Sequence, residues 1–413
     1  HSATMVKAGV CLLMRMYPVL AGTGHFEAIV SAVGLVTLLF AAFIALFKHD
    51  LKGLLAYSTV SHLGLIVFLI GLGSPLAGVA AVFHVLNHAT FKASLFMIAG
   101  IVDHETQSRD MRQLAGLFKL MPWTATLSMV AAASMAGVPL TNGFLSKEMF
   151  FTKAVVGTSG LYAWLVPVLV TLAGVFSVAY SLRFVHDTYF NGALGDVPNK
   201  KPHEPALGMK LPTLLLVVMC IVVGSLPAMT FGPLVHVAAT ALAGQALPEY
   251  RLALWHGFNL PLLMSAVAMV GGVSLYLWLA RGRRLHRVVS EAWFGPATGR
   301  NIFEWLTHTL FGMAVRITAW LETGSLQRYV GWLLLSALVL GALPLVGSGM
   351  ATGARPQLPA TPLAWAVWAL LLVTCAAIVR THHQRFVAVV LVGVVGVAAS
   401  MTFLGFSAPD LAL

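Results

Sequence analysis

Charged residues are scarce in this sequence, and acidic residues are the scarcest. Only 9% of the 413 residues are charged, whereas 59% are hydrophobic and the mean hydropathy is +0.87. Soluble domains carry roughly 25% charged residues, so this composition excludes an ordinary soluble protein. It predicts a polytopic membrane protein.

Several motifs that would carry chemistry are also absent. The chain has no Walker loop, no Rossmann glycine motif and no nucleophile–histidine arrangement, so we expect no cofactor and no catalytic residue. The three cysteines stand singly in apolar runs without a C-x-x-C spacing, which argues against a disulfide or an iron–sulfur cluster. Glu148 is the one acid clearly inside these runs, although a sodium site needs several oxygen ligands. The chain is therefore better equipped for protons than for sodium.

Long apolar runs are the main feature that the sequence does have. A run of about 20 apolar residues spans the roughly 30 Å hydrocarbon core of a bilayer, and the chain contains about eleven such runs. Runs of this length and uniformity predict helices rather than barrel strands. The predicted spans are 1–20, 27–47, 54–73, 76–102, 122–156, 161–186, 207–228, 257–280, 330–347, 363–379 and 386–406.

The run 122–156 is too long for one straight span and too short for two. Its middle, MAGVPLTNGF, contains Gly137, Pro139 and Gly143. Breaks at membrane depth are tolerated where the freed backbone groups are buried in protein or face a cavity. We therefore predict one discontinuous helix over 122–156.

Lysine and arginine fall in alternate loops when 122–156 counts as one span. One set of loops holds only Arg251 and Arg355, whereas basic residues gather at 48–52, 109–119, 183–210, 281–328 and 380–385. By the positive-inside rule the basic set is cytoplasmic. Orientation and contact with the anionic lipid bilayer thus explain the net charge of +11, and we expect no nucleic-acid partner.

Three titratable residues share one face of the run 76–102. His84, His88 and Lys92, in FHVLNHATFKASLF, are spaced i, i+4 and i+8, which aligns them over about 12 Å of helix. An ionisable residue at the bilayer centre costs roughly 2.5 to 3.5 kcal/mol, so each is a candidate functional residue. Histidine accepts and donates protons, and a lysine removed from water can exchange its proton near neutrality. The row predicts a proton relay.

Two other interpretations of this row stay open. The histidines could be core residues that form hydrogen bonds with neighbouring helices, while Lys92 extends toward the membrane surface. Histidines at i and i+4 also have a metal-ligand spacing. No carboxylate or cysteine lies on that face to complete a site, so we expect no metal.

Four further residues extend the candidate relay. Lys147 follows the predicted helix break, Lys52 and His62 lie ten residues apart in KHDLKGLLAYSTVSHLG, and His1 opens HSATMVKAG. Lys52 also fits a simpler role, a charge that marks the cytoplasmic start of a helix. The candidate proton relay therefore comprises His1, Lys52, His62, His84, His88, Lys92 and Lys147, with Lys7 and Glu148 as further candidates.

Six stretches of the chain together resemble one family. They are HSATMVKAGV, DLKGLLAYSTVSHLG, FHVLNHATFKASLFMIAGIVDHET, RDMRQLAGL, PLTNGFLSKE and YSLRFVHDTYF, in continuous order over residues 1 to about 195. They resemble the antiporter-like subunits shared by complex I and the Mrp-type multisubunit cation/proton antiporters. Within this family Lys7, the stretch GIVDHETQSRD and the C-terminal FSAPDLAL are similar to the A-type subunit of Mrp antiporters.

The resemblance implies a fold and a division of the chain. Residues 1–195 would form the second half of the proton-translocating module. Residues 196–360 would add transmembrane helices with a basic and amphipathic segment at 281–328, and 361–413 would begin a C-terminal membrane module. The family's first half-channel would precede His1, so we expect the chain to be part of a longer protein.

The resemblance also implies roles for individual residues. His1 matches a histidine that switches between conformations. His84, His88 and Lys92 match the middle axis of the proton path, and Lys147 matches the terminal lysine on a broken helix. Lys52 matches a lysine on the way between them.

The function that the resemblance implies is transport. The chain would be a proton-conducting subunit of a sodium/proton antiporter in the bacterial inner membrane, with other small membrane subunits as partners and H+ and Na+ as its ions. It would not be an enzyme. Three alternatives remain: the proton-pumping large subunit of complex I, a proton-conducting partner in inorganic-carbon uptake, and a structural membrane subunit.

Overall fold

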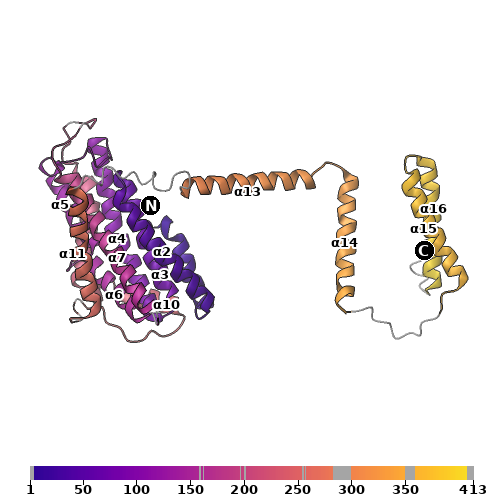
Figure 1. Cartoon of the computed structure of the whole chain (residues 1–413), viewed down its shortest axis with the longest axis horizontal. Coiled ribbons are helices and arrows are strands. Elements are labelled where there is room, and N and C mark those ends of the chain that lie inside the picture. Colours follow the sequence, from indigo (N-terminus) through magenta and orange to yellow (C-terminus); the bar gives the residue numbers. More distant parts are fainter. Residues whose placement is uncertain are drawn as a thin grey trace. The chain divides into compact units, whose positions relative to one another are not determined.

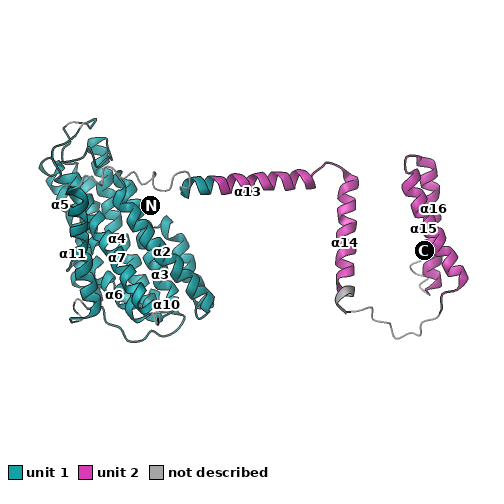
Figure 2. Ribbon diagram, viewed as in Figure 1, with its two compact units in different colours: residues 1–304 teal, residues 305–413 magenta. Residues whose placement is uncertain are grey.

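The computed structural model of the chain is helical throughout. Every named element in it is a helix, which confirms the all-α fold. Two compact units divide the chain, His1–Glu304 and Trp305–Leu413, coloured teal and magenta in Figure 2. The structure describes residues 4–157, 160, 162–195, 197–199, 201–253, 255, 257–281, 299–348 and 359–406.

The first unit is a bundle of long helices with several short ones among them (Figure 1). Its core lies between the helices of the bundle and consists of buried aliphatic and aromatic side chains. In chain order the helices are η1 (Met5–Lys7), α1 (Ala8–Leu20), α2 (Gly24–Phe47), α3 (Leu51–Gly71), α4 (Pro75–Thr106), η2 (Leu117–Lys119), α5 (Pro122–Ala136), α6 (Asn142–Val156), α7 (Tyr162–Tyr189), α8 (Leu207–Ser225), α9 (Pro227–Thr230), α10 (Gly232–Ala243) and α11 (Leu260–Arg281).

Nine helices of the described residues are long and apolar enough to cross a membrane, compared with about eleven predicted spans. Each predicted run does contain helix. The run 1–20 differs because its described part forms the 3-residue helix η1 and the 13-residue helix α1, and neither is long enough to be a candidate span. The run 122–156 differs because it is divided into two 15-residue helices. The 12-residue helix α10 has no counterpart among the predicted spans, since it is too short to cross a bilayer.

The break between α5 and α6 confirms the predicted discontinuous helix. Gly137 follows α5 with a φ of 83°, a left-handed conformation that glycine adopts without steric cost. The amides of Gly137 and Val138 both donate to Ala133 O, at 3.0 and 2.9 Å, which satisfies a carbonyl at the helix end. A Cβ on Gly143 would lie 1.7 Å from Ser134 O. Only glycine therefore allows α6 to begin so close to the end of α5.

The described residues of the second unit form four helices, three of which are long and apolar enough to cross a membrane. Helices α15 (Pro362–Thr381) and α16 (Arg385–Gly405) form a hairpin, seen in yellow in Figure 1. Helix α13 (Gly299–Leu321) begins in the first unit and is followed by α14 (Leu326–Ser348). The predicted amphipathic segment 301–328 thus covers most of α13 and the start of α14.

Candidate proton-transfer site

Five of the predicted relay residues lie together inside the first unit. His62 comes from α3, His84, His88 and Lys92 come from α4, and Lys147 comes from α6. All five side chains are buried, and the most accessible residue of the five is only 8% exposed. The structure therefore brings these titratable groups out of contact with bulk solvent.

The three histidines form a triangular cluster in which the ring of His62 is equally far from the other two rings. His62 Nδ1 is 3.0 Å from His84 Nε2, and the two ring planes are only 17° apart. The ring of His88 lies 5.2 Å from that of His62 and 6.1 Å from that of His84, measured between centroids. Phe91 packs edge-on against all three rings. A histidine from α3 thus joins the two histidines of α4 in one cluster.

His88 differs from its neighbours in its hydrogen bonding. Neither its ring nitrogens nor the side-chain amide of Asn87 has a partner among the described residues, and both side chains are 0% exposed. Buried polar groups are nearly always hydrogen-bonded, and leaving one unpaired is costly. Packing alone therefore does not explain why these two polar residues lie there.

The two lysines lie at the carboxyl end of α5. Lys92 Nζ donates to the hydroxyl of Ser58 and lies 3.2 Å from the sulfur of Met135. Lys147 Nζ donates to Ala136 O at 2.7 Å and to Ser177 Oγ at 3.0 Å. The unpaired carbonyls at the end of a helix carry partial negative charge, which stabilises nearby cations. The helix break therefore provides a main-chain carbonyl for the ammonium group of Lys147, whereas Lys92 contacts a side chain in the last turn of α5.

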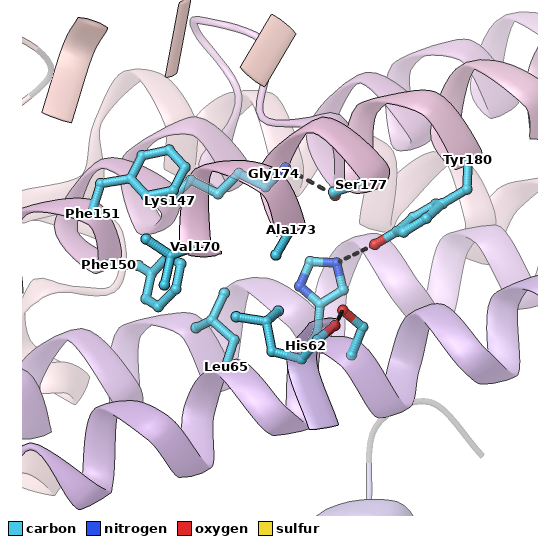
Figure 3. Close-up of a pocket in the computed structure, with 12 residues that line it drawn as sticks. His62, Leu65, Lys147, Phe150, Phe151, Val170, Ala173, Gly174, Ser177 and Tyr180 are labelled. Atoms are coloured by element: carbon cyan, nitrogen blue, oxygen red, sulfur yellow. Dashed lines mark hydrogen bonds between the residues drawn. The ribbon is translucent and has the colours of Figure 1, made fainter. Parts of the chain in front are cut away.

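A small cavity separates Lys147 from His62 (Figure 3). Its volume is about 20 Å³, which is enough for one water molecule. Ser177 and Tyr180 of α7 also line it, and the dashed lines in Figure 3 join Lys147 to Ser177 and His62 to Tyr180. The lysine of α6 and the histidine of α3 thus face the same space.

Hydroxyl residues of the site were not predictable from the sequence. Ser146 Oγ lies 2.9 Å from His84 Nδ1, and Tyr180 OH lies 3.4 Å from His62 Nε2. Serine and threonine in apolar helices commonly bond to their own helix, as Ser181 does here with Ser177 O. No sequence signal therefore distinguishes a serine that contacts a histidine from one that does not.

Lys52 lies apart from the histidines, at a charged end of the bundle where α3 begins and α4 ends. Its Nζ is 2.7 Å from Asp103 Oδ2, and the two side chains are 37% and 32% exposed. In the following loop Arg112 forms an ion pair with Asp110 at 2.6 Å, and hydrogen bonds from its guanidinium lower the pKa of the Asp110 carboxyl. Lys52 thus belongs to a set of paired surface charges.

Arg183 lies near the same end but is fully buried. Its Nε is 3.1 Å from Asp187 Oδ2, and its guanidinium also donates to Leu46 O and to His49 Nδ1. Because a buried charge needs a partner and several hydrogen bonds, this arrangement holds α7 against the end of α2. Arg183, which begins the predicted basic stretch 183–210, is therefore a buried residue that packs α7 against α2.

The remaining predicted residues have separate positions. Lys7 is 3% exposed, and its Nζ donates to Val85 O at 2.9 Å, one residue beyond His84. Glu148 is 5% exposed and follows Lys147 in α6. His1 lies outside the described residues. In the part of the chain that the structure describes, no group of three or more histidine, cysteine or acidic side chains is arranged so that it could hold a metal ion, and the three cysteines are free.

The sequence matches two known families. Residues 2–177 match the family described as "NADH:quinone oxidoreductase/Mrp antiporter, TM", and residues 370–413 match the family of the MBH D-type subunit. The first match contains all five buried residues of the predicted relay. It places residues 2–177 of the chain in the antiporter-like subunit family. Within this family the chain is similar to the A-type subunit of Mrp antiporters over its full length.

Two curated relatives and one solved structure illustrate this similarity. The chain is 49% identical to the A/B-type subunit of a probable K(+)/H(+) antiporter of Rhizobium meliloti and 35% identical to the A-type subunit of the Na(+)/H(+) antiporter of Alkalihalophilus pseudofirmus. All of the chain is covered, but only 41% and 54% of these relatives, so it spans about half their length. The Mrp complex from Dietzia sp. matches with a TM-score of 0.68 and 35% identity, covering 99% of this chain and 44% of that one. Like these antiporter subunits, the chain is a multi-pass protein of the bacterial cell membrane.

Proposed function

We propose that this chain is the proton-conducting part of a subunit in a multisubunit monovalent cation/proton antiporter. One observation carries the proposal. Five buried titratable side chains from three helices meet beside a helix break. Four of them have neutral hydrogen-bond partners, which are hydroxyls, a carbonyl, a thioether and each other, and His88 has none among the described residues. Groups with neutral partners can gain and lose a proton without breaking an ion pair, which is what a relay requires.

The proposed path runs through these residues in a physical order. Lys147 and His62 face one cavity, His62 contacts His84, and Lys92 lies at the same end of α5 as Lys147. A proton would move between lysine and histidine through hydroxyls or single water molecules. The chain would need no cofactor and would catalyse no covalent reaction.

The exchanged cation and the partners belong to the same proposal. The two relatives are named for potassium and for sodium, so both ions are candidates. No cluster of carboxylates lies among the buried residues that the structure describes to bind either ion, and we propose that the cation crosses elsewhere in the assembled complex. The partners would be other small membrane subunits of that complex.

The test uses the full-length subunit in its whole complex, in everted membrane vesicles with an imposed proton gradient. Adding NaCl or KCl should collapse the gradient in the absence of NADH and quinone. Choline chloride serves as the control, because it supplies the same anion without an alkali cation. Proton movement that required NADH and quinone would instead favour the complex I alternative and contradict antiport.

A further inference from the structure

A chain of hydrogen bonds runs through four helices and contains two histidines. Tyr180 OH of α7 lies 3.4 Å from His62 Nε2, and His62 Nδ1 lies 3.0 Å from His84 Nε2. His84 Nδ1 in turn lies 2.9 Å from Ser146 Oγ of α6. Ser146 Oγ is also 3.4 Å from Gly143 O, a carbonyl to which its hydroxyl can donate. Both histidines thus use both ring nitrogens, and a hydroxyl closes each end.

Only two arrangements of protons satisfy every link when both histidines are neutral. A neutral imidazole has one N–H donor and one acceptor nitrogen. In the first arrangement His62 Nδ1–H donates to His84 Nε2, His84 Nδ1–H donates to Ser146, and Tyr180 donates to His62. In the second, Ser146 donates to His84 Nδ1, His84 Nε2–H donates to His62 Nδ1, and His62 Nε2–H donates to Tyr180. The two hydroxyls fit both arrangements because each can donate or accept.

Passing one proton along the chain converts one arrangement into the other. A proton that joins His62 Nε2 in the first arrangement makes an imidazolium, whose Nδ1 proton moves to His84 Nε2. His84 then releases its own Nδ1 proton on the Ser146 side. One proton has entered and one has left, and both histidines now carry their proton on Nε2. The chain must return to the first arrangement before it can carry a second proton the same way.

We propose that Tyr180 and Ser146 are positioning residues that keep this histidine pair reversible. Each hydroxyl turns from donor to acceptor as the neighbouring histidine changes tautomer, so neither arrangement leaves a buried N–H without a partner. Removing one hydroxyl lowers the free energy of one arrangement relative to the other and slows the return step. This inference rests on the proposed function, because it describes how the same site handles protons.

The two substitutions should bias the tautomers in opposite directions. In Tyr180→Phe the Nε2 of His62 has no partner, and an unpaired lone pair is more readily accommodated than an unpaired N–H. Both histidines should then carry the proton on Nδ1. In Ser146→Ala the Nδ1 of His84 has no partner, so both histidines should carry the proton on Nε2.

The experiment measures tautomers directly in the purified whole complex labelled with 15N-histidine. Solid-state NMR distinguishes protonated Nδ1 from protonated Nε2, and His62→Gln and His84→Gln assign the signals. Tyr189→Phe is the matched control, because Tyr189 is buried on the same helix and its hydroxyl forms no hydrogen bond with His62 or His84. It should leave the histidine signals unchanged.

Cation-driven proton flux is measured on the same variants. Tyr180→Phe and Ser146→Ala should each lower it roughly tenfold or more, within the range of a lost acid–base contribution. Unchanged tautomers, or the same tautomer in both variants, would overturn the proposal, and so would shifted tautomers with normal flux. A complex without any cation-driven flux would contradict only the proposed function, since the tautomers of the resting complex still decide this inference.

Discussion

Two groups of lysines in the first unit differ in what they contact. Lys92 and Lys147 lie inside the bundle, and their Nζ atoms contact hydroxyls, a thioether and a main-chain carbonyl. Lys52 lies at the charged end, where its Nζ contacts the carboxylate of Asp103. The first two residues are at most 8% exposed, whereas the side chain of Lys52 is 37% exposed.

This difference separates lysines whose partners are neutral from a lysine that forms an ion pair. The Nζ of Lys52 lies 2.7 Å from a carboxylate oxygen. Hydroxyl and carbonyl dipoles hold an ammonium group more weakly, and burial opposes its charge. The interior lysines are therefore suited to proton exchange, and the lysine at the charged end is suited to orientation and packing. The predictions below test this division.

The largest effect is expected at Lys147. Lys147→Ala in the full-length subunit should abolish cation-driven proton flux while the complex still assembles, because the side chain bonds to only one carbonyl and one hydroxyl. Lys147→Arg should also fail, since a guanidinium does not deprotonate in proteins. Flux in vesicles and the yield of purified complex are the measurements. Lys153→Ala, on the same helix but partly exposed, is the control and should keep most of the flux.

A large effect is also expected at the histidines. His84→Gln and His88→Gln should each slow flux severely, because glutamine forms hydrogen bonds but does not titrate near neutral pH. The double variant should be little worse than the worse single variant, since residues acting in series do not add. Flux and complex yield are measured together. Near-normal flux in the double glutamine variant would show that the histidines serve packing.

The sequence predicted one part of this site and not the other. The spacing of His84, His88 and Lys92 identified one face of α4, because helical periodicity is a local property. The same periodicity says nothing about how neighbouring helices are aligned, so the position of His62 beside both His84 and His88 was not predictable. The partner of Lys52 was hidden for the same reason, since Asp103 lies 51 residues away.

The fold shows the same division between local and long-range information. The residues around Gly137 predicted a break, because glycine and proline interrupt helices by their own backbone preferences. Hydropathy predicted the long helices, because about 20 apolar residues match the bilayer thickness. It did not predict α10, whose 12 residues are apolar but too few to cross. Short helices that pack within the bundle give no signal of this kind.

An intermediate effect is expected at Gly137. Gly137→Ala places a Cβ 2.7 Å from Lys147 Cδ and requires alanine at a φ of 83°, so the Lys147 side chain must move. The left-handed conformation alone costs about 1–2 kcal/mol in a residue other than glycine. Thermal unfolding of the complex should begin at a lower temperature, and flux should fall severalfold. Gly9→Ala is the control, since a Cβ there meets no atom within 4 Å.

A small effect is expected at Lys52. Lys52→Ala removes a half-exposed ion pair with Asp103, and such pairs contribute about 0–1 kcal/mol. Flux should stay close to that of the unsubstituted complex, because Lys52 lies apart from the buried histidines and lysines. Raising the salt concentration should reduce the difference from the unsubstituted complex further. Loss of flux comparable to Lys147→Ala would contradict the division drawn here and place Lys52 in the relay.

The smallest effect is expected at Arg281, which ends α11 with an exposed side chain. Surface substitutions of this kind change stability by about 0.5 kcal/mol or less, so Arg281→Ala should transport normally.

The same position also tests the orientation of the chain in the membrane. In a background without Cys11, Cys220 and Cys375, Arg281→Cys should react with a membrane-impermeant thiol reagent from the cytoplasmic side only. Arg251→Cys, exposed in a loop of the opposite set, should react from the outside only. Labelling from the reverse sides would contradict the positive-inside orientation and, with it, the count of 122–156 as a single crossing. Labelling of both from one side would show that α11, which separates Arg251 from Arg281, does not cross the membrane.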